Sequence, residues 1–161
     1  MKFKSLIFIT LLIAVFQVKA QQPTVLPQFT FFKLDGKPFS NKDLVQGKKN
    51  LFMLFDCTCE HCQREAKLLN ENHAQLKNTN IYMITLDEAY IIPQFFTSYA
   101  KGLNSKPNVT VLQDKNRTFI PTFLPKMYPG IYLYSATGKL LVYNAGDGGI
   151  KKVVTALRKI K

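Results

Sequence analysis

The sequence predicts an α/β fold in which helices flank a central mixed β-sheet. Three observations predict it. A strand-length apolar run, KKNLFMLFD at residues 48–56, leads directly into a helical pattern. Strand and helix patterns then alternate as far as residue 114, and the chain finishes with a hairpin and a last helix. This order is typical of a sheet that carries helices on both faces.

The first element after a proline-containing lead is a β-hairpin. Residues 29–40, FTFFKLDGKPFS, form two short strands joined by a turn at Asp35 and Gly36. The run at residues 48–56 is apolar throughout, as expected of a central strand buried on both faces. It ends at the only three cysteines of the chain, which lie within six positions.

A helix is predicted to begin at Cys59 and to pack on the sheet. Its apolar stripe follows steps of four and three residues, which is the spacing of one helical face. The stripe consists of Cys62, Ala66, Leu69, His73 and Leu76. We expect His73 to lie at the edge of the core and to be hydrogen-bonded, as most histidines on an apolar stripe are.

The second half of the chain repeats the alternation. A second strand at residues 80–88 precedes a helix at 89–102, in which Pro93 is tolerated in the first turn. One face of that helix gathers Ile92, Phe95, Phe96, Tyr99 and Leu103. The remaining elements are a strand at 108–114, an irregular proline-rich loop, a hairpin at 130–146 and an amphipathic helix at 148–161.

Residues 1–20 are predicted to be a signal peptide, and residues 21–161 a single domain. Lys2 and Lys4 precede the apolar run LIFITLLIAVF, and the segment ends at Ala20 with the small residue of a peptidase site. The run is short for a membrane span, which needs about 20 residues. The alternative is an uncleaved N-terminal anchor, and no other segment is apolar enough to cross a membrane.

The composition fits an exported globular protein with a sizeable core. The chain is 47% hydrophobic and has a net charge of +12, with its basic residues scattered. Scattered charge without an aromatic-flanked basic patch argues against nucleic-acid binding. It is expected to form a solvated basic surface, and the alternative is a role in binding acidic partners or an anionic membrane surface. Three clustered cysteines do not make a structural disulfide framework, so their role is chemical.

Cys59 and Cys62 have the spacing of a redox pair at a strand-to-helix junction. The first turn of a helix exposes unpaired N–H groups that stabilise a thiolate, so Cys59 is the expected nucleophile. Cys62, one turn deeper, is then placed to resolve a mixed disulfide. A CxxC motif alone fits a zinc site equally well, but its place between a strand and a helix favours redox chemistry.

Two segments carry a resemblance to a known family. NLFMLFDCTCEHCQREAKLLN (50–70) and YPGIYLYSATGKLL (128–141) resemble the thioredoxin-like thiol-disulfide oxidoreductases of the bacterial cell envelope, in their TlpA/ResA-like branch. The resemblance covers residues 27–161. It implies a thioredoxin-like fold with an N-terminal β-hairpin and a βα insertion after the second strand, and a location in the periplasm or cell envelope.

The resemblance also implies the roles of individual residues. Cys59 would attack, Cys62 would resolve, Pro129 would be the cis-proline, and Tyr128 would offer backbone groups to a substrate chain. Such an enzyme needs no cofactor. Its partners would be protein disulfides or dithiols and a membrane or envelope electron-donor protein.

Several positions depart from the family pattern. Thr58 replaces the usual tryptophan, and Met53 stands where a buried acid is common. A cationic His61 would stabilise a thiolate and favour an oxidant, whereas Glu60 opposes this, so the redox direction stays open. Asp56 would be a substitute for the missing acid in proton handling, or simply a capping residue at the end of the strand.

Cys57 has no counterpart in the usual motif, and it leaves alternatives open. It is either a small, partly buried side chain or a third thiol that shuffles disulfides. A rival function is a Cu(I)- or Zn(II)-binding module built from Cys57, Cys59, His61 and Cys62. A second rival is an interaction protein with inert cysteines. A peroxiredoxin is disfavoured, because no PxxxTxxC motif precedes a cysteine.

Overall fold

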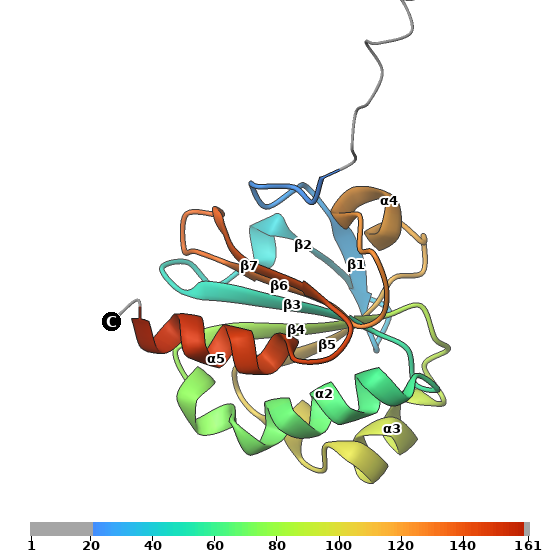
Figure 1. Cartoon of the computed structure of the whole chain (residues 1–161). Coiled ribbons are helices and arrows are strands. Elements are labelled where there is room, and N and C mark those ends of the chain that lie inside the picture. The colour runs from blue at the N-terminus through green and yellow to red at the C-terminus, as the bar shows by residue number, and fades with distance from the viewer. Residues whose placement is uncertain (1–20, 160–161) are drawn as a thin grey trace, which may run out of the picture.

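The computed structural model describes residues 21–159 (Figure 1). The signal peptide predicted for residues 1–20 lies outside the described residues. The strands are β1 (Thr30–Lys33), β2 (Pro38–Ser40), β3 (Lys49–Phe55), β4 (Thr79–Thr85), β5 (Val109–Gln113), β6 (Gly130–Tyr134) and β7 (Leu140–Ala145). The helices are α2 (Glu60–Glu71), α3 (Ile92–Tyr99), α4 (Phe119–Phe123) and α5 (Gly149–Lys159), with short 3₁₀ turns η1 (Asn41–Asp43), η2 (His73–Leu76) and η3 (Leu103–Ser105).

The strands form one mixed sheet of seven strands in the order β2-β1-β5-β4-β3-β6-β7. Strands β3, β4 and β5 are parallel, whereas β1 pairs antiparallel with β5, and β6 pairs antiparallel with β3. The predicted hairpins are both present, as β1–β2 and β6–β7. The unit α3–β5 is the predicted βα insertion, and it extends the sheet beyond β4. The predicted fold class is therefore confirmed.

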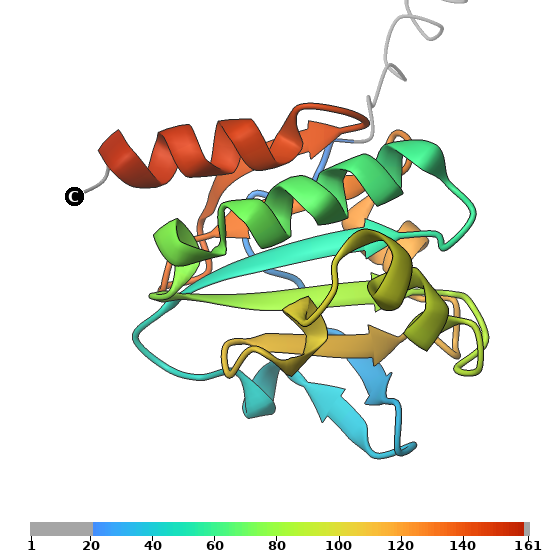
Figure 2. The same cartoon turned by 90° about the horizontal axis from the view of Figure 1, so that it is seen from below.

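Strand β3 divides the core into two layers, because its side chains alternate between the faces of the sheet. Leu51, Met53 and Phe55 pack in one cluster with buried residues of α2, α3 and α5. Phe52 and Leu54 pack on the other face in an aromatic cluster that includes α4. Figure 1 shows the three longer helices on one side of the sheet and α4 on the other, and Figure 2 shows α2, α3 and α5 covering their face. Helices thus lie on both faces, but unequally.

The two predicted long helices are shorter than their apolar patterns. Helix α2 ends at Glu71, and the 3₁₀ turn η2 continues the stripe to the buried Leu76. His73 is half-buried and its Nε2 lies 2.7 Å from Oδ1 of Asn108, which confirms the expected hydrogen bond at the core boundary. Helix α3 ends at Tyr99, whose side chain is 40% exposed rather than part of the core.

The prediction of an irregular loop before the last hairpin is wrong in one respect, because residues 119–123 form helix α4. The carboxylate of Asp114 accepts hydrogen bonds from the backbone N–H groups of Thr118 at 3.0 Å and Phe119 at 2.7 Å. The rings of Phe119 and Phe123 stack with centroids 4.2 Å apart inside the aromatic cluster. Pro121 lies in the first turn, where a helix needs no N–H donor.

No helix within residues 21–159 has the length and apolarity to cross a membrane.

Candidate active site

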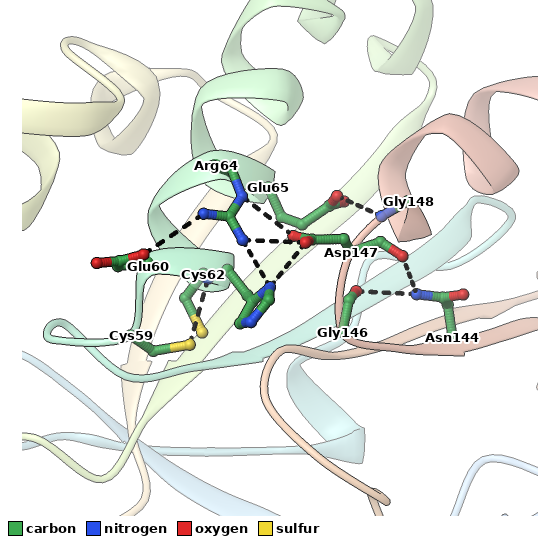
Figure 3. Close-up of polar contacts among 10 residues, drawn as sticks. Cys59, Glu60, Cys62, Arg64, Glu65, Asn144, Gly146, Asp147 and Gly148 are labelled. Carbon is green, nitrogen blue, oxygen red and sulfur yellow. Dashed lines mark hydrogen bonds and ion pairs between the residues drawn. The ribbon is translucent and has the colours of Figure 1, made fainter.

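The cysteine pair lies where β3 runs into α2. Cys59 is the N-cap of α2, and its Sγ accepts a hydrogen bond from the backbone N–H of Cys62 at 3.4 Å (Figure 3). Cys59 is half-exposed and Cys62 is fully buried. The predicted placement of Cys59 at the helix start and of Cys62 one turn inward is therefore confirmed. Cys59, the solvent-accessible cysteine of the pair, is therefore also the one whose sulfur lies at the N-terminus of α2.

The other two thiols are held in the protonated form. Burial, and then the hydrogen bond to Cys59, raises the pKa of Cys62 well above its ordinary value. Burial, and then the Asp87 carboxylate, raises the pKa of Cys57 in the same way. Because the thiolate and not the thiol is the nucleophile, neither Cys57 nor Cys62 is activated as long as Cys59 has not reacted.

The backbone of Cys57 is fixed on both sides. Its N–H donates to Oδ2 of Asp87 at 2.7 Å, and its carbonyl accepts from Nε2 of Gln63 at 3.1 Å. Asp87 also accepts from the hydroxyl of Thr85 at 2.8 Å. Cys57 thus occupies a rigid point of the loop, half-buried, as the simpler of its two interpretations expects.

Asp56 caps the turn that leads to the cysteines. Its Oδ1 accepts from the backbone N–H of Thr58 at 2.7 Å and from the Thr58 hydroxyl at 2.6 Å. This is the capping role that is the alternative to proton handling. Thr58 itself is exposed, so no bulky side chain shields the loop where the family carries tryptophan.

His61 belongs to a polar network on the exposed face of α2. Its Nδ1 lies 2.7 Å from Oδ2 of Asp147 and 2.7 Å from Nη2 of Arg64. Arg64 donates to Asp147 at 3.0 Å and is 3.7 Å from the carboxylate of Glu60. Arg64, and then His61, lowers the pKa of Asp147. The two inner residues of the motif, Glu60 and His61, are therefore tied together through Arg64.

A buried carboxylate joins α2 to α5 beneath this network. Glu65 is 1% exposed, and its two oxygens accept from the backbone N–H groups of Gly148 at 2.6 Å and Ile150 at 2.8 Å. These N–H groups belong to the start of α5, where a helix leaves donors unpaired and favours negative charge. Glu65 thus fixes the N-terminus of α5 against the helix that carries the cysteines.

The proline loop is placed beside the cysteine loop by the sheet register. The Tyr128–Pro129 peptide bond is cis, as predicted for Pro129. Gly130 pairs with Leu54 in β3, so Pro129 lies next to the end of the strand that leads to Cys59. Tyr128 is half-buried, and burial, followed by nearby acidic groups, raises the pKa of its phenol.

The residues of the alternative metal-binding function do not form an assembled ligand set in the described part of the chain. Within residues 21–159 no group of three or more cysteine, histidine or acidic side chains is arranged to hold a metal ion. His61 faces Asp147 instead of joining the thiols of Cys57, Cys59 and Cys62 in a ligand set.

Comparisons with known proteins identify the family. The family model described as AhpC/TSA matches residues 24–142. The chain belongs to the AhpC/TSA family. This AhpC/TSA-family chain is 28% identical to the thiol-disulfide oxidoreductase ResA of Bacillus thuringiensis (strain Al Hakam) over 137 residues, which cover 83% of this chain and 75% of ResA. The predicted resemblance to thioredoxin-like thiol-disulfide oxidoreductases is confirmed.

Solved structures show the same fold. DsbF of Mycobacterium tuberculosis superposes with a TM-score of 0.69 at 20% identity, covering 88% of this chain and 100% of DsbF. A secreted disulfide oxidoreductase of the same organism, homologous to E. coli DsbE, gives a TM-score of 0.64 at 22% identity, over 82% and 96% of the two chains. The thioredoxin-like architecture of this AhpC/TSA-family chain follows from these likenesses.

Three acidic residues of the site were not predicted. Asp87 lies two residues beyond the end of β4, the strand parallel to β3, so its place at the same edge of the sheet was an available signal. Glu65 lies three residues after Cys62 and next to Ala66 on the buried stripe of α2, where an acid needs a partner. Nothing in the local sequence around Asp147 predicted a place in the site, because only the folded chain brings this residue to α2.

Proposed function

We propose that the chain is an exported thiol-disulfide oxidoreductase that exchanges disulfides with partner proteins through Cys59 and Cys62. The observation that carries the proposal is the pair itself. A half-exposed Sγ at the N-cap of α2 accepts an N–H from a buried second cysteine at 3.4 Å. A nucleophile at the surface with a protected resolving thiol behind it is the arrangement that two-step exchange requires.

The reaction proceeds in two balanced steps. The Cys59 thiolate attacks one sulfur of a substrate disulfide, the substrate S–S bond breaks, and one substrate sulfur leaves as a thiolate. Cys62 then loses its proton and attacks Sγ of Cys59, which breaks the mixed disulfide and releases the second substrate sulfur. The substrate gains two electrons and the proton of Cys62, and its second thiolate takes a proton from solvent, which replaces the one that Cys59 lost when its thiolate formed. The Cys59–Cys62 disulfide forms. The reverse sequence oxidises a dithiol, and no cofactor takes part.

Substrate binding is assigned to the edge of the sheet beside the pair. Tyr128 and Pro129 precede β6 next to the end of β3. The carbonyl of Pro129 already accepts from the N–H of Gly146 at 3.0 Å, so the contact with an extended substrate chain is assigned to the backbone of Tyr128. A hollow of about 260 Å³ adjoins Cys57 on the other side, against α3. Its lining combines an apolar floor with polar side chains: Cys57, Thr58, Ile91, Gln94, Phe95, Ser98 and Tyr99.

Export is part of the proposal. It rests on the basic, apolar and small-residue order of residues 1–20, with residues 21–161 as the exported domain. The electron donor is then a membrane or envelope protein that renews the dithiol or the disulfide. Mass measurement of the protein recovered from the cell envelope tests this, because cleavage after Ala20 leaves Gln21 as the first residue.

Single-cysteine variants test the chemistry. We expect Cys59→Ser to abolish exchange with a model protein disulfide, because the nucleophile is gone. Cys62→Ser should accumulate mixed disulfides with partners, which non-reducing gels reveal, because the resolving step is blocked. Cys57→Ser is the matched control and should retain exchange. Full turnover by Cys59→Ser would rule the proposal out.

A further inference from the structure

The loop that carries Asp147 is held on both sides by hydrogen bonds that do not involve His61 or Arg64. The side-chain amide of Asn144 donates to the carbonyls of Gly146 at 2.9 Å and Asp147 at 3.2 Å. On the other side, Glu65 accepts from Gly148 at 2.6 Å (Figure 3). The backbone around Asp147 is therefore rigid, and its carboxylate reaches α2 from a fixed point.

That carboxylate meets a histidine whose nitrogen has two competing neighbours. Nδ1 of His61 lies 2.7 Å from Asp147 and also 2.7 Å from Nη2 of Arg64. With a proton, Nδ1 donates to Asp147; without one, it accepts from Arg64, and it cannot do both. Asp147 therefore favours the forms of the imidazole that are protonated at Nδ1, which include the cation, whereas Arg64 favours a neutral imidazole without that proton.

We propose that Asp147 is a positioning residue for the disulfide exchange: its carboxylate holds the proton on Nδ1 of His61 and keeps a cationic imidazole near Cys59. This inference rests on the proposed function. The charged groups around His61 are Asp147 from the β7–α5 loop, Arg64 and Glu60 from α2, and Cys59 itself. The positive charge of Arg64 disfavours the imidazolium, and the negative charge of Asp147 offsets this effect of Arg64.

The consequence is a more oxidising pair. A cation near Cys59 stabilises its thiolate, which favours the reduced form and raises the reduction potential. Asp147 has a negative charge of its own that acts in the opposite direction. The side chains of His61 and Asp147 are both 48% exposed, so solvent screens both charges, but His61 is only two residues from Cys59, whereas Asp147 contacts α2 through His61 and Arg64. The effect through His61 therefore prevails.

The test compares reduction potentials in glutathione buffers. We expect Asp147→Asn to lower the equilibrium constant for oxidation of glutathione at least about threefold, or about 14 mV for a two-electron couple. His61→Gln should lower it similarly, and the double variant should show no further change, because Asp147 acts through His61. Asp35→Asn is the matched control: it removes an equally exposed carboxylate paired with Lys37 in the distant hairpin.

Nitrogen-15 NMR of the imidazole gives a second readout that does not depend on redox chemistry. At any one pH, both ring nitrogens of His61 should give signals of the protonated type in a larger fraction of the wild type than of Asp147→Asn, where Arg64 is the remaining close partner. An unchanged or raised potential in Asp147→Asn, or additive shifts in the double variant, would overturn the inference. A wild-type protein without any Cys59–Cys62 couple would instead overturn the proposed function, and this inference with it.

Discussion

The three cysteines of one hexapeptide lie in three different environments. Cys59 caps a helix at the surface, Cys62 is buried beneath it, and Cys57 is fixed between Asp87 and Gln63. Burial raises the pKa of Cys62 and of Cys57, so both thiols keep their protons at neutral pH. The three cysteines are therefore expected to differ in reactivity because of their positions in the fold, although the residue type is the same.

Selective alkylation measures this difference. At pH 7 we expect iodoacetamide to modify Cys59 at least about tenfold faster than Cys57 or Cys62, because the thiolate reacts and the buried thiols are protonated and shielded. All three lie in the tryptic peptide 50–64, so fragment-ion mass spectrometry must locate the label. In urea the three rates should converge. Equal rates in the folded, reduced protein would contradict the assignment.

At the residue scale, what the sequence could predict depended on whether the signal was local. Cys59, Cys62 and Pro129 each stand in a local pattern, a strand end or a motif, and the structure places them as expected. Asp147 lies 86 positions from His61, and their contact depends on how α5 meets α2. Long-range side-chain pairs of this kind have no counterpart in periodicity or spacing.

At the element scale, Glu65 determines how the cysteine helix meets the C-terminal helix. Its two oxygens take two N–H groups at the start of α5, and almost none of the side chain is exposed. The loop between β7 and α5 therefore moves with α2, and Asp147 with it. Removing one acceptor oxygen leaves a buried donor without a partner, which is costly.

Glu65→Gln tests this joint. We expect it to lower the free energy of unfolding by about 1–3 kcal/mol, since the amide nitrogen faces an N–H donor in place of an acceptor. Urea unfolding measures the change. Glu71→Gln, an exposed site on the same helix, is the control and should shift it by less than about 0.5 kcal/mol. If Glu65→Gln is as stable as its control, the joint does not contribute to stability.

Helix α4 shows why one element was missed. The helix contains a proline in its five residues and lacks the length over which helical periodicity is visible. The helix forms because Asp114 accepts its first N–H groups and because Phe119 and Phe123 stack in the aromatic cluster. Tertiary contacts thus stabilise a turn that the local sequence alone does not specify.

At the scale of the whole molecule, sheet order brings the site together. The parallel pair β3–β4 places Asp56 and Asp87 at one edge, and antiparallel β6 places Pro129 beside them. The predicted alternation of strands and helices was sufficient to bring the ends of β3 and β4 to one edge, because parallel strands end at a common edge, but it identified neither Asp87 nor the antiparallel pairing of β6 with β3. The distribution of the helices over the two faces of the sheet could not be predicted, because it depends on how the side chains pack in the core.

Alkaline pH should destabilise the reduced protein. Burial raises the pKa of Tyr82 to about 12 and raises the pKa values of Tyr132, Tyr134 and Cys62 as well. Unfolded, these groups lose protons near their ordinary values of 9.0 for cysteine and 10.0 for tyrosine. The unfolded state then binds fewer protons than the folded one, so stability falls as pH rises.

Urea unfolding from pH 8 to pH 10.5 measures this loss. Above its unfolded pKa each group contributes about 1.4 kcal/mol per pH unit. The fall should begin near pH 9 in the reduced wild type, and near pH 10 in the double variant Cys57→Ser/Cys62→Ser, which lacks both thiols whose pKa burial raises. A flat profile to pH 10.5 would show that these groups titrate alike in both states.

The central claim is that Cys59 and Cys62 form the redox couple and that Cys57 stays outside it. The most direct test is a glutathione-buffered titration of the protein with thiols counted by mass spectrometry at each point. We predict a single two-electron transition that joins Cys59 to Cys62 and leaves Cys57 free throughout. No titratable transition, or a disulfide that includes Cys57, would contradict the account.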